Sequence, residues 1–559
     1  MSTPRLGRAA LAVLSGIAWW AACPPCGLWP LALVCWVPLL VAMRASSPRE
    51  AALLGGLQGL VANLALAVWL PDVVRTFAPL SLFACWGITV GLCLYNAGGV
   101  ALCAWVSRRA AGAGWPPGIA FVLAVAVKEA FYPVLFPVVA ALQVHQVVAL
   151  VQLAELGGPV LVGVPLTLAN VGAAELVASF TERRRARRAW VAVAFAAPLF
   201  SALFGAWRIS VVDARASAAP SARIGIVQAN TPHAGTTLRA AIEAHVAASQ
   251  RIESEGPVDL LVWPETALAG VIPKGELETT LRREVLQDPE GTPGARLTAP
   301  VLSGVMLRRG HEHTNSAVLF DAAGSVHGTY DKVHPLVFGE YIPLGDRFPA
   351  LYRWMRNAGR LTAGPLDQPA LPLGEHRIAT LICYEDLLAS YTNDVARQTR
   401  PDLLVNLSND SWFGDSSAAA THFAMATLRA VEHRRYLVVA SGSGVSGIVD
   451  PSGRPSRETP LLEAATRVAV VHWMREPTLY EHVGDVPWWF AACACLAMAF
   501  VPRRGLRMML GREDDDEPDH RGGLQAGAAR RDAVRRGDAL RGDHARAGPR
   551  RPSLADQGG

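Results

Sequence analysis

The long apolar beginning of the chain constrains the fold more than any other feature. Residues 1–206 are almost continuously apolar, 486–501 are apolar again, and the residues between them read as a globular domain. A bilayer core needs about 20 mostly apolar residues per helix. The candidate segments are 9–23, 28–43, 51–70, 79–106, 117–136, 148–178, 189–206 and 486–501. The sequence therefore predicts a multi-pass α-helical membrane domain of about eight spans.

Arginines beside these segments predict the orientation of the chain. They fall on alternate loops and at the flanks: Arg5, Arg8, Arg44, Arg49, Arg108, Arg109, Arg183, Arg184, Arg185, Arg187, Arg188, Arg503, Arg504 and Arg507. The intervening loops 24–27 and 137–147 have no Lys or Arg, and 71–78 has only Arg75. Because positively charged loops stay in the cytoplasm, both termini are expected there, with the globular part on the outer side.

Four parts follow from this pattern. We expect a seven-span membrane domain over 1–207, a catalytic domain over 208–482, an eighth transmembrane helix over 483–502 and a tail over 503–559. The tail mixes Arg with Asp, Glu, Gly and Ala and is expected to be disordered and cytoplasmic. The net charge of +5 comes largely from the arginines beside the spans, so it does not indicate a nucleic-acid partner.

The globular part alternates between strand-like and helical patterns. Val-, Ile- and Leu-rich runs separated by helical patterns predict an α/β fold with sheets covered by helices. The strand-like runs are 222–228, 258–263, 301–307, 316–320, 377–383, 402–407, 436–440, 445–449 and 468–473, and the helical patterns are 237–253, 386–399 and 418–434. Reactive side chains in such folds usually lie at strand ends.

Cys383 is the only cysteine in this globular part. The other eight lie in or beside apolar segments: Cys23, Cys26, Cys35, Cys85, Cys93, Cys103, Cys493 and Cys495. A lone cysteine is either a small buried hydrophobic residue or a reactive thiol. Glu265 and Lys332 also follow strand-like runs, although single residues of these types are usually just solvated. A glutamate can take the thiol proton, and a lysine can stabilise a thiolate or an oxyanion.

The residues around these three positions resemble a known superfamily. Trp263-Pro264-Glu265-Thr266-Ala267, Asp331-Lys332-Val333-His334-Pro335, Phe338-Gly339-Glu340-Tyr341-Ile342-Pro343 and Cys383-Tyr384-Glu385 are similar to motifs of the nitrilase, or carbon–nitrogen hydrolase, superfamily. The stretch from Asn406 to Asp415, together with the span layout, resembles the apolipoprotein N-acyltransferase family.

The resemblance implies a nitrilase-like αββα sandwich with a Glu-Lys-Cys triad. Cys383 would be the nucleophile, Glu265 the general base, and Lys332 the stabiliser of the thiolate and oxyanion, with Glu340 and Glu385 in support. The implied reaction moves an acyl chain from a phospholipid to the α-amine of a diacylated apolipoprotein through a thioester. It takes place at the periplasmic face of a bacterial inner membrane and requires no cofactor or metal.

Two other functions remain open at this stage. A membrane-tethered amidase would use the same triad on a small molecule with water as acceptor. A non-catalytic membrane module that keeps the fold is the second alternative. His311-Glu312-His313 could resemble metal ligands, but their spacing is poor, and a solvated loop is expected.

Two further features are suited to lipid substrates. Lys128 and Glu129 lie inside an apolar segment, where ionisable residues are costly and usually face a cavity or each other. They either line a lipid or substrate path or simply pair near an interface. The apolar loops 336–338 and 344–354 either face the bilayer and control access to the site or are ordinary packed loops.

Overall fold

The computed structural model describes residues 5–182, 188–231, 237–287, 296–355 and 357–503. The predicted disordered tail lies outside the described residues, except for Arg503. The arginines from 183 to 187 that supported the orientation also lie outside them.

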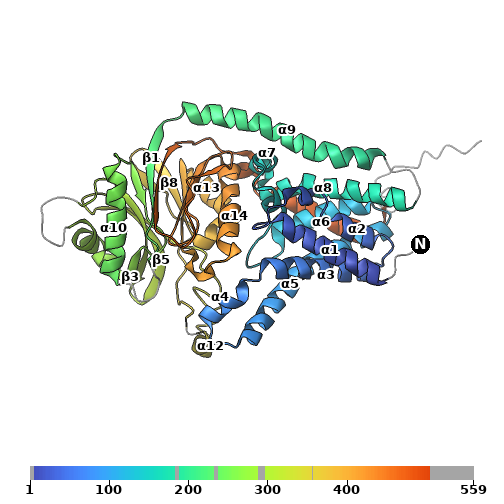
Figure 1. The fold of residues 1–559 in the computed structure, drawn as a ribbon, viewed down its shortest axis with the longest axis horizontal. Helices are drawn as coiled ribbons and strands as arrows, with labels where there is room; N and C mark the ends of the chain where they lie inside the picture. The colour runs from blue at the N-terminus through green and yellow to red at the C-terminus, as the bar shows by residue number, and fades with distance from the viewer. Residues whose placement is uncertain (1–4, 183–187, 232–236, 288–295, 356, 504–559) are drawn as a thin grey trace, which may run out of the picture. The chain divides into compact units, whose positions relative to one another are not determined.

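Helices occupy all eight apolar segments, and two short helices lie in the stretches 71–78 and 137–147 that were predicted as loops (Figure 1). They are α1 Arg5–Ala22, η1 Trp29–Leu33, α2 Val37–Met43, α3 Pro48–Leu66, α4 Leu70–Phe77, α5 Leu82–Gly112, α6 Pro117–Phe131, η2 Ala140–Val144, α7 Val148–Val151, α8 Ala154–Thr181, α9 Arg188–Ala218 and α16 Val486–Phe500. Segment 148–178 is longer than one span needs, and it is broken between α7 and α8 with a further kink at Gly157 and Gly158.

Helix length and apolarity support a membrane domain without establishing eight spans. Among the described residues, α5, α8 and α9 are long and apolar enough to cross a bilayer. Helices α3 and α4, bent by 66° at their junction, would make a fourth span if they count as one. The apolar helices Trp29–Met43 and Val486–Phe500 are shorter. The multi-pass membrane domain is therefore supported, and the count of eight stays a prediction.

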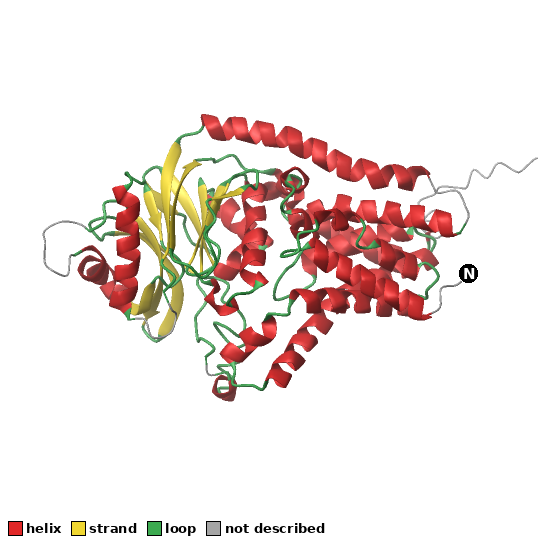
Figure 2. Ribbon diagram, viewed as in Figure 1, coloured by secondary structure: helices red, strands yellow, loops and turns green. Residues whose placement is uncertain are grey.

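Two sheets lie at the centre of the remaining described part of the chain (Figure 2). The first has the order β13-β1-β2-β4-β5-β6, with β3 also paired to β4, and the second has the order β12-β11-β10-β9-β8-β7. The strands of the first sheet are β1 Ser221–Gln228, β2 Leu260–Val262, β3 Leu268–Pro273, β4 Val301–Arg309, β5 Glu312–Phe320, β6 Val326–Asp331 and β13 Ala465–His472. Those of the second are β7 Leu371–Leu373, β8 His376–Ile382, β9 Leu403–Ser408, β10 Tyr436–Ser441, β11 Gly447–Val449 and β12 Pro455–Ser456.

Alternate residues of the first sheet belong to two different cores. Ile224, Ile226 and Leu302 pack with residues of the second sheet, whereas Val227 and Val301 pack against α10 Leu238–Ser254. This alternation follows from the two-residue period of a strand. Helices α13 Ala389–Thr399 and α14 Ser417–His433 cover the other side of the second sheet, as Figure 1 shows. The predicted αββα sandwich is confirmed.

Helix α14 is buried from His422 to His433 because this part lies between the second sheet and the helical bundle. Phe423 packs in the sheet core, whereas Met425 and Leu428 belong to cores formed with membrane-domain helices. Arg434, the residue after the end of α14, forms a buried ion pair with Glu155 of α8, with 2.7 Å between Arg434 Nε and Glu155 Oε2. These contacts attach the catalytic sheets to the helical bundle.

Candidate active site

The three predicted catalytic residues follow strands that end at the same edge of their sheets. Glu265 follows β2, and Lys332 follows β6. β2 runs parallel to β4. β6 also runs in the same direction as β4, because β5 lies between them and is antiparallel to both. Cys383 follows β8, which is parallel to β9 in the second sheet. Strand direction therefore delivers all three side chains to one cavity.

Lys332 lies between two glutamates. Its Nζ atom is 2.7 Å from Glu340 Oε2 and 3.3 Å from Glu265 Oε1. Asn315 of β5 donates from Nδ2 to both carboxylates, over 2.6 Å to Glu265 and 2.9 Å to Glu340. The backbone N–H of Leu336 also donates to Glu340 over 2.6 Å. This network orients the two carboxylates around one ammonium group.

Burial and charge set the protonation of this cluster. Burial lowers the pKa of Lys332, but the charges of Glu265 and Glu340 outweigh it and hold that pKa well above its ordinary value. Burial raises the pKa of Glu265 despite the nearby Lys332. Burial and the charge of Glu265 raise the pKa of the Cys383 thiol well above its ordinary value, against the opposing effect of Lys332. The resting Cys383 side chain is therefore a protonated thiol.

Cys383 adopts a strained backbone conformation with a φ of 53°. Such left-handed conformations of non-glycine residues persist where the surrounding structure holds them, often at functional sites. Here the holding group is Glu385, which is fully buried. Its carboxylate accepts from the backbone N–H of Ile382 over 2.8 Å and from that of Val333 over 2.7 Å. Glu385 thus joins the Cys383 turn to the loop that carries Lys332.

Burial also raises the pKa of Glu385 to about 7. The hydroxyl group of Tyr330 donates to this carboxylate over 2.7 Å, and the backbone N–H of His334 donates over 3.1 Å. Glu385 is therefore a positioning residue in this arrangement, because its oxygens are occupied by groups that hold the site together.

The turn that carries Glu265 requires a glycine beside it. A side-chain carbon on Gly304 of β4 would lie 2.6 Å from Glu265 Cα and 2.5 Å from the backbone nitrogen of Thr266. Any larger residue would push this turn away from Lys332. Gly304 thus allows the turn that carries Glu265 to pack closely against β4.

The cavity at this edge has a volume of about 430 Å³. Glu265, Lys332 and Cys383 all line it, together with Glu340. Helical-bundle residues line it too, namely Val73 and Phe77 of α4 and Phe136 from the loop after α6. Ring contacts continue this junction, with centroids 4.9 Å apart for Phe77 and Trp412 and 5.2 Å apart for Trp69 and Phe413. The reactive residues thus share one cavity with the apolar helices.

The predicted apolar loops near the cavity present bulky side chains to the outside. Phe338, Leu344, Phe348 and Trp354 are 50%, 68%, 52% and 76% exposed. Phe338 also has a left-handed backbone with a φ of 67°. Groups of exposed apolar residues are typical of a protein or membrane contact.

Sequence reasoning missed several polar residues that complete the site. Asn315 is the clearest: it lies inside β5 but directly before the predicted strand-like run 316–320, so no sequence pattern marked it. A second group lies behind Cys383, where the His422 ring nitrogens are 2.8 Å from Asp386 Oδ1 and 2.9 Å from Asp410 Oδ1. Burial lowers the pKa of His422, but the two carboxylates outweigh it and raise that pKa well above its ordinary value. This imidazolium connects the Cys383 turn to α14 and to the end of β9.

His311-Glu312-His313 does not form a metal centre in the described residues. Glu312 and His313 begin β5, and no group of three or more His, Cys, Asp or Glu side chains suited to a metal ion occurs in the described part of the chain.

Comparison with known families agrees with both halves of the chain. The family model for "Carbon-nitrogen hydrolase" matches residues 223–472. The model for "Apolipoprotein N-acyltransferase N-terminal domain" matches residues 15–172. The two matches cover the sheets with the triad positions and most of the helical bundle.

Individual proteins extend this likeness over most of the chain. The chain is 30% identical to an apolipoprotein N-acyltransferase of Geobacter metallireducens, over 88% of this chain and 94% of the relative. It is 30% identical to the enzyme of the same name from Pseudomonas putida, over 84% of this chain and 92% of the relative. An amidase from Nesterenkonia sp. is a distant structural neighbour with a TM-score of 0.35 and 20% identity, covering 48% of this chain and 95% of that one.

The two near-full-length relatives match the membrane part and the sheet part in one continuous order, so the resemblance first seen in short motifs extends to the whole architecture. On these grounds the chain belongs to the apolipoprotein N-acyltransferase family, whose catalytic half is a carbon–nitrogen hydrolase domain.

Proposed function

We propose that this protein transfers an acyl chain from a phospholipid to the N-terminal α-amine of a diacylglyceryl-cysteine apolipoprotein. The observation that carries the proposal is the shared lining of one cavity by Cys383, Glu265 and Lys332 and by apolar residues of the helical bundle. A small-molecule amidase needs the first set but has no use for the second. Both substrates of an acyl transfer carry long chains, and these chains keep the reacting groups near the membrane surface.

The first half of the reaction forms a thioester. Glu265 takes the proton from the Cys383 thiol as the sulfur attacks an ester carbonyl of the phospholipid. Lys332 stabilises the negative charge that develops on the carbonyl oxygen. The carbon–oxygen ester bond then breaks, and Glu265 returns the proton to the oxygen of the departing lysophospholipid.

The second half transfers the acyl chain to nitrogen. The neutral α-amine attacks the thioester carbonyl, the carbon–sulfur bond breaks, and an amide forms. Glu265 takes the proton released by the amine and returns it to the Cys383 sulfur, which restores the resting thiol. Two substrates thus use one nucleophile in turn, as expected for ping-pong kinetics. Glu340 and Glu385 position Lys332 and the Cys383 turn.

The membrane arrangement is part of the same proposal. Residues 1–207 form the seven-span domain, 208–482 the catalytic domain and 483–502 the eighth transmembrane helix, with 503–559 as a cytoplasmic tail. The protein lies in a bacterial inner membrane with its catalytic domain in the periplasm. The arginines at Arg44, Arg49, Arg108 and Arg109 support this orientation, because positive loops stay in the cytoplasm.

Trapping the intermediate tests the function directly. Full-length protein in detergent micelles, incubated with a phospholipid alone, is expected to gain the mass of one acyl chain on the Cys383 peptide. Adding a diacylated lipopeptide should remove that mass and place it on the peptide α-amine. Hydrolysis of small amides without any acyl adduct would favour the amidase alternative, and no adduct and no hydrolysis would favour the non-catalytic module.

The exposed apolar loops lead to a second prediction. Phe338→Asp is expected to slow acylation by membrane-embedded phospholipid at least tenfold, because a carboxylate there opposes contact with the acyl region of the bilayer. Phe338→Leu is the matched control and should retain most of the activity. Initial acylation rates in vesicles and with a short-chain soluble donor separate the two effects. Unchanged rates for Phe338→Asp in vesicles would contradict a membrane-facing loop.

A further inference from the structure

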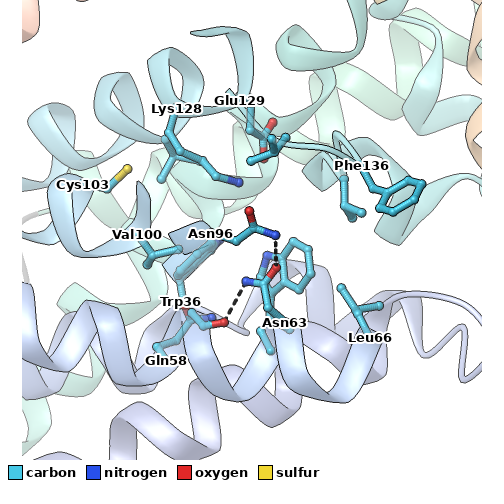
Figure 3. A pocket seen from close by; sticks show the side chains of 16 residues that line it. Trp36, Gln58, Asn63, Leu66, Asn96, Val100, Cys103, Lys128, Glu129 and Phe136 are labelled. Carbon is cyan, nitrogen blue, oxygen red and sulfur yellow. Dashed lines mark hydrogen bonds between the residues drawn. The ribbon is translucent and has the colours of Figure 1, made fainter. Parts of the chain in front are cut away.

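A second cavity, inside the helical bundle, has no part in the chemistry proposed above. It has a volume of about 50 Å³ and lies among residues of α1, α3, α5 and α6 (Figure 3). Lys128 of α6 points into it, toward Asn96 of α5. By volume it has room for a few water molecules, since one needs about 10–15 Å³ of such space. The cavity is thus a polar space in otherwise apolar surroundings.

Its walls carry polar atoms that no described residue satisfies. Trp19 Nε1, Gln58 Oε1, Asn96 Oδ1 and Glu129 Oε2 are buried and have no hydrogen-bond partner in the described part of the chain. The Lys128 side chain also lines this cavity. Buried polar groups in proteins are nearly always paired with protein or ordered water. We infer that water occupies this cavity.

An apolar pocket of about 100 Å³ lies between this cavity and Cys383, because it shares lining residues with the cavity and is also lined by the cysteine. Cys383 lines the pocket, with apolar neighbours such as Leu336, Tyr384 and Leu387. The residues that line both the apolar pocket and the polar cavity are Asn63, Leu66, Asn96, Phe136 and Val138. Cys383 therefore lines one end of the pocket. The side-chain amides of Asn63 and Asn96 lie at the boundary between the pocket and the polar cavity.

The two amides at this boundary are held in place. Asn96 Nδ2 donates to Asn63 Oδ1 over 3.3 Å, and Asn63 Nδ2 donates to the carbonyl oxygen of Gly59 over 2.8 Å. Figure 3 shows both hydrogen bonds, with Asn63 and Asn96 between Lys128 and Leu66. The pair thus joins α3 to α5 where the apolar lining ends.

We propose that Asn63 and Asn96 limit the length of the acyl chain that Cys383 accepts. This inference rests on the proposed acyl transfer, because the occupant of the pocket is the chain esterified to the cysteine sulfur. Each methylene gains free energy by entering the apolar pocket. A methylene that passes Asn96 displaces water from Lys128 and from the unpaired oxygens of Gln58 and Glu129, and it offers them no hydrogen bond in return. Longer chains are therefore disfavoured.

Replacing one amide tests this limit. Full-length Asn96→Leu is compared with wild type on phospholipids that differ only in the length of their saturated chains. The expected result is a shift of the fastest acylation toward longer chains, by about tenfold in relative rate for two added methylenes. Asn96→Gln is the matched control, and because it keeps an amide at the boundary it should retain the wild-type preference.

The outcomes separate this inference from the function on which it rests. If wild type acylates Cys383 but Asn96→Leu shows the same length profile, the chain leaves the pocket sideways into the bilayer and the inference fails. If wild type transfers no chain of any length, the proposed function fails. Should Asn96→Leu be inactive with every donor, Asn63→Leu decides, because it removes the other amide of the same boundary. An unshifted profile there overturns the proposal.

Discussion

Replacing Cys383 with alanine is expected to abolish both the acyl adduct and the modification of lipopeptide amines. The thiol is the only cysteine in the cavity that also holds Glu265 and Lys332. Without the sulfur no thioester forms, and water or amine must attack the phospholipid ester directly. Intact-mass measurement of the protein after incubation with phospholipid, with a lipopeptide transfer assay beside it, checks both steps.

The matched control is Cys493→Ala, which removes an exposed cysteine of α16 far along the chain from the motif residues. This variant should keep the adduct and the transfer activity. Cys383→Ala that still modifies the lipopeptide amine, under conditions where wild type does so, would refute covalent catalysis at this residue. Loss of activity in both variants would point instead to a general effect of cysteine replacement.

Glu265→Gln is expected to lower the rate of Cys383 acylation by about 10²- to 10⁴-fold, the usual contribution of a general base. The resting thiol is protonated because burial and the charge of Glu265 raise its pKa well above the ordinary value. A glutamine keeps the hydrogen-bonding shape beside Asn315 but cannot accept the proton. Single-turnover measurement of adduct formation isolates this step from the later transfer.

Glu340→Gln is the matched comparison, since it also removes one negative charge within reach of Lys332. If Glu265 is the base, Glu340→Gln should slow acylation much less than Glu265→Gln does. An equal loss in both variants would mean that the charge beside Lys332 matters and that proton removal at Glu265 does not.

The pH dependence of acylation follows from the same assignment. Burial raises the pKa of Glu265 above its ordinary value of 4.5, and a base works only when it is ionised. The wild-type rate should therefore rise with pH through this raised pKa and fall on the acidic side of it. Glu265→Gln should lose that acidic limb while retaining its low residual rate. A wild-type rate that is flat across the acidic range would contradict the assignment.

Much of the fold was predictable because its signals are local. Apolar segments long enough for a bilayer, and Val-rich runs bounded by turns, mark most of the helices and strands. Three strands were missed: β7 and β12 contain only three and two residues, too few for a clear period, and β3 was missed as well. The number of spans could not be fixed from apolar segments either. Helices α6 and α16 are only 15 residues long, shorter than the roughly 20 residues that a span needs.

Some residues of the candidate site were also predictable from the sequence, and others were not. Glu265, Lys332 and Cys383 could be named because the residues around each of them match motifs of the carbon–nitrogen hydrolase superfamily. Asn315 could not, since its contact with both glutamates depends on the register in which β5 pairs with β4 and β6. His422 lies far along the chain from Asp386, and only the packing of α14 on the second sheet brings them together.

The sequence by itself determined the chemical identity of the reacting groups and the division of the chain into apolar and globular parts, since both depend on residue type and short-range pattern. Only the tertiary structure decided which partners surround Lys332, how Glu385 holds the Cys383 turn, and that Asn63 and Asn96 line the same pocket as Cys383. These contacts join residues distant in the chain, and their energies depend on burial and distance, which no local pattern specifies.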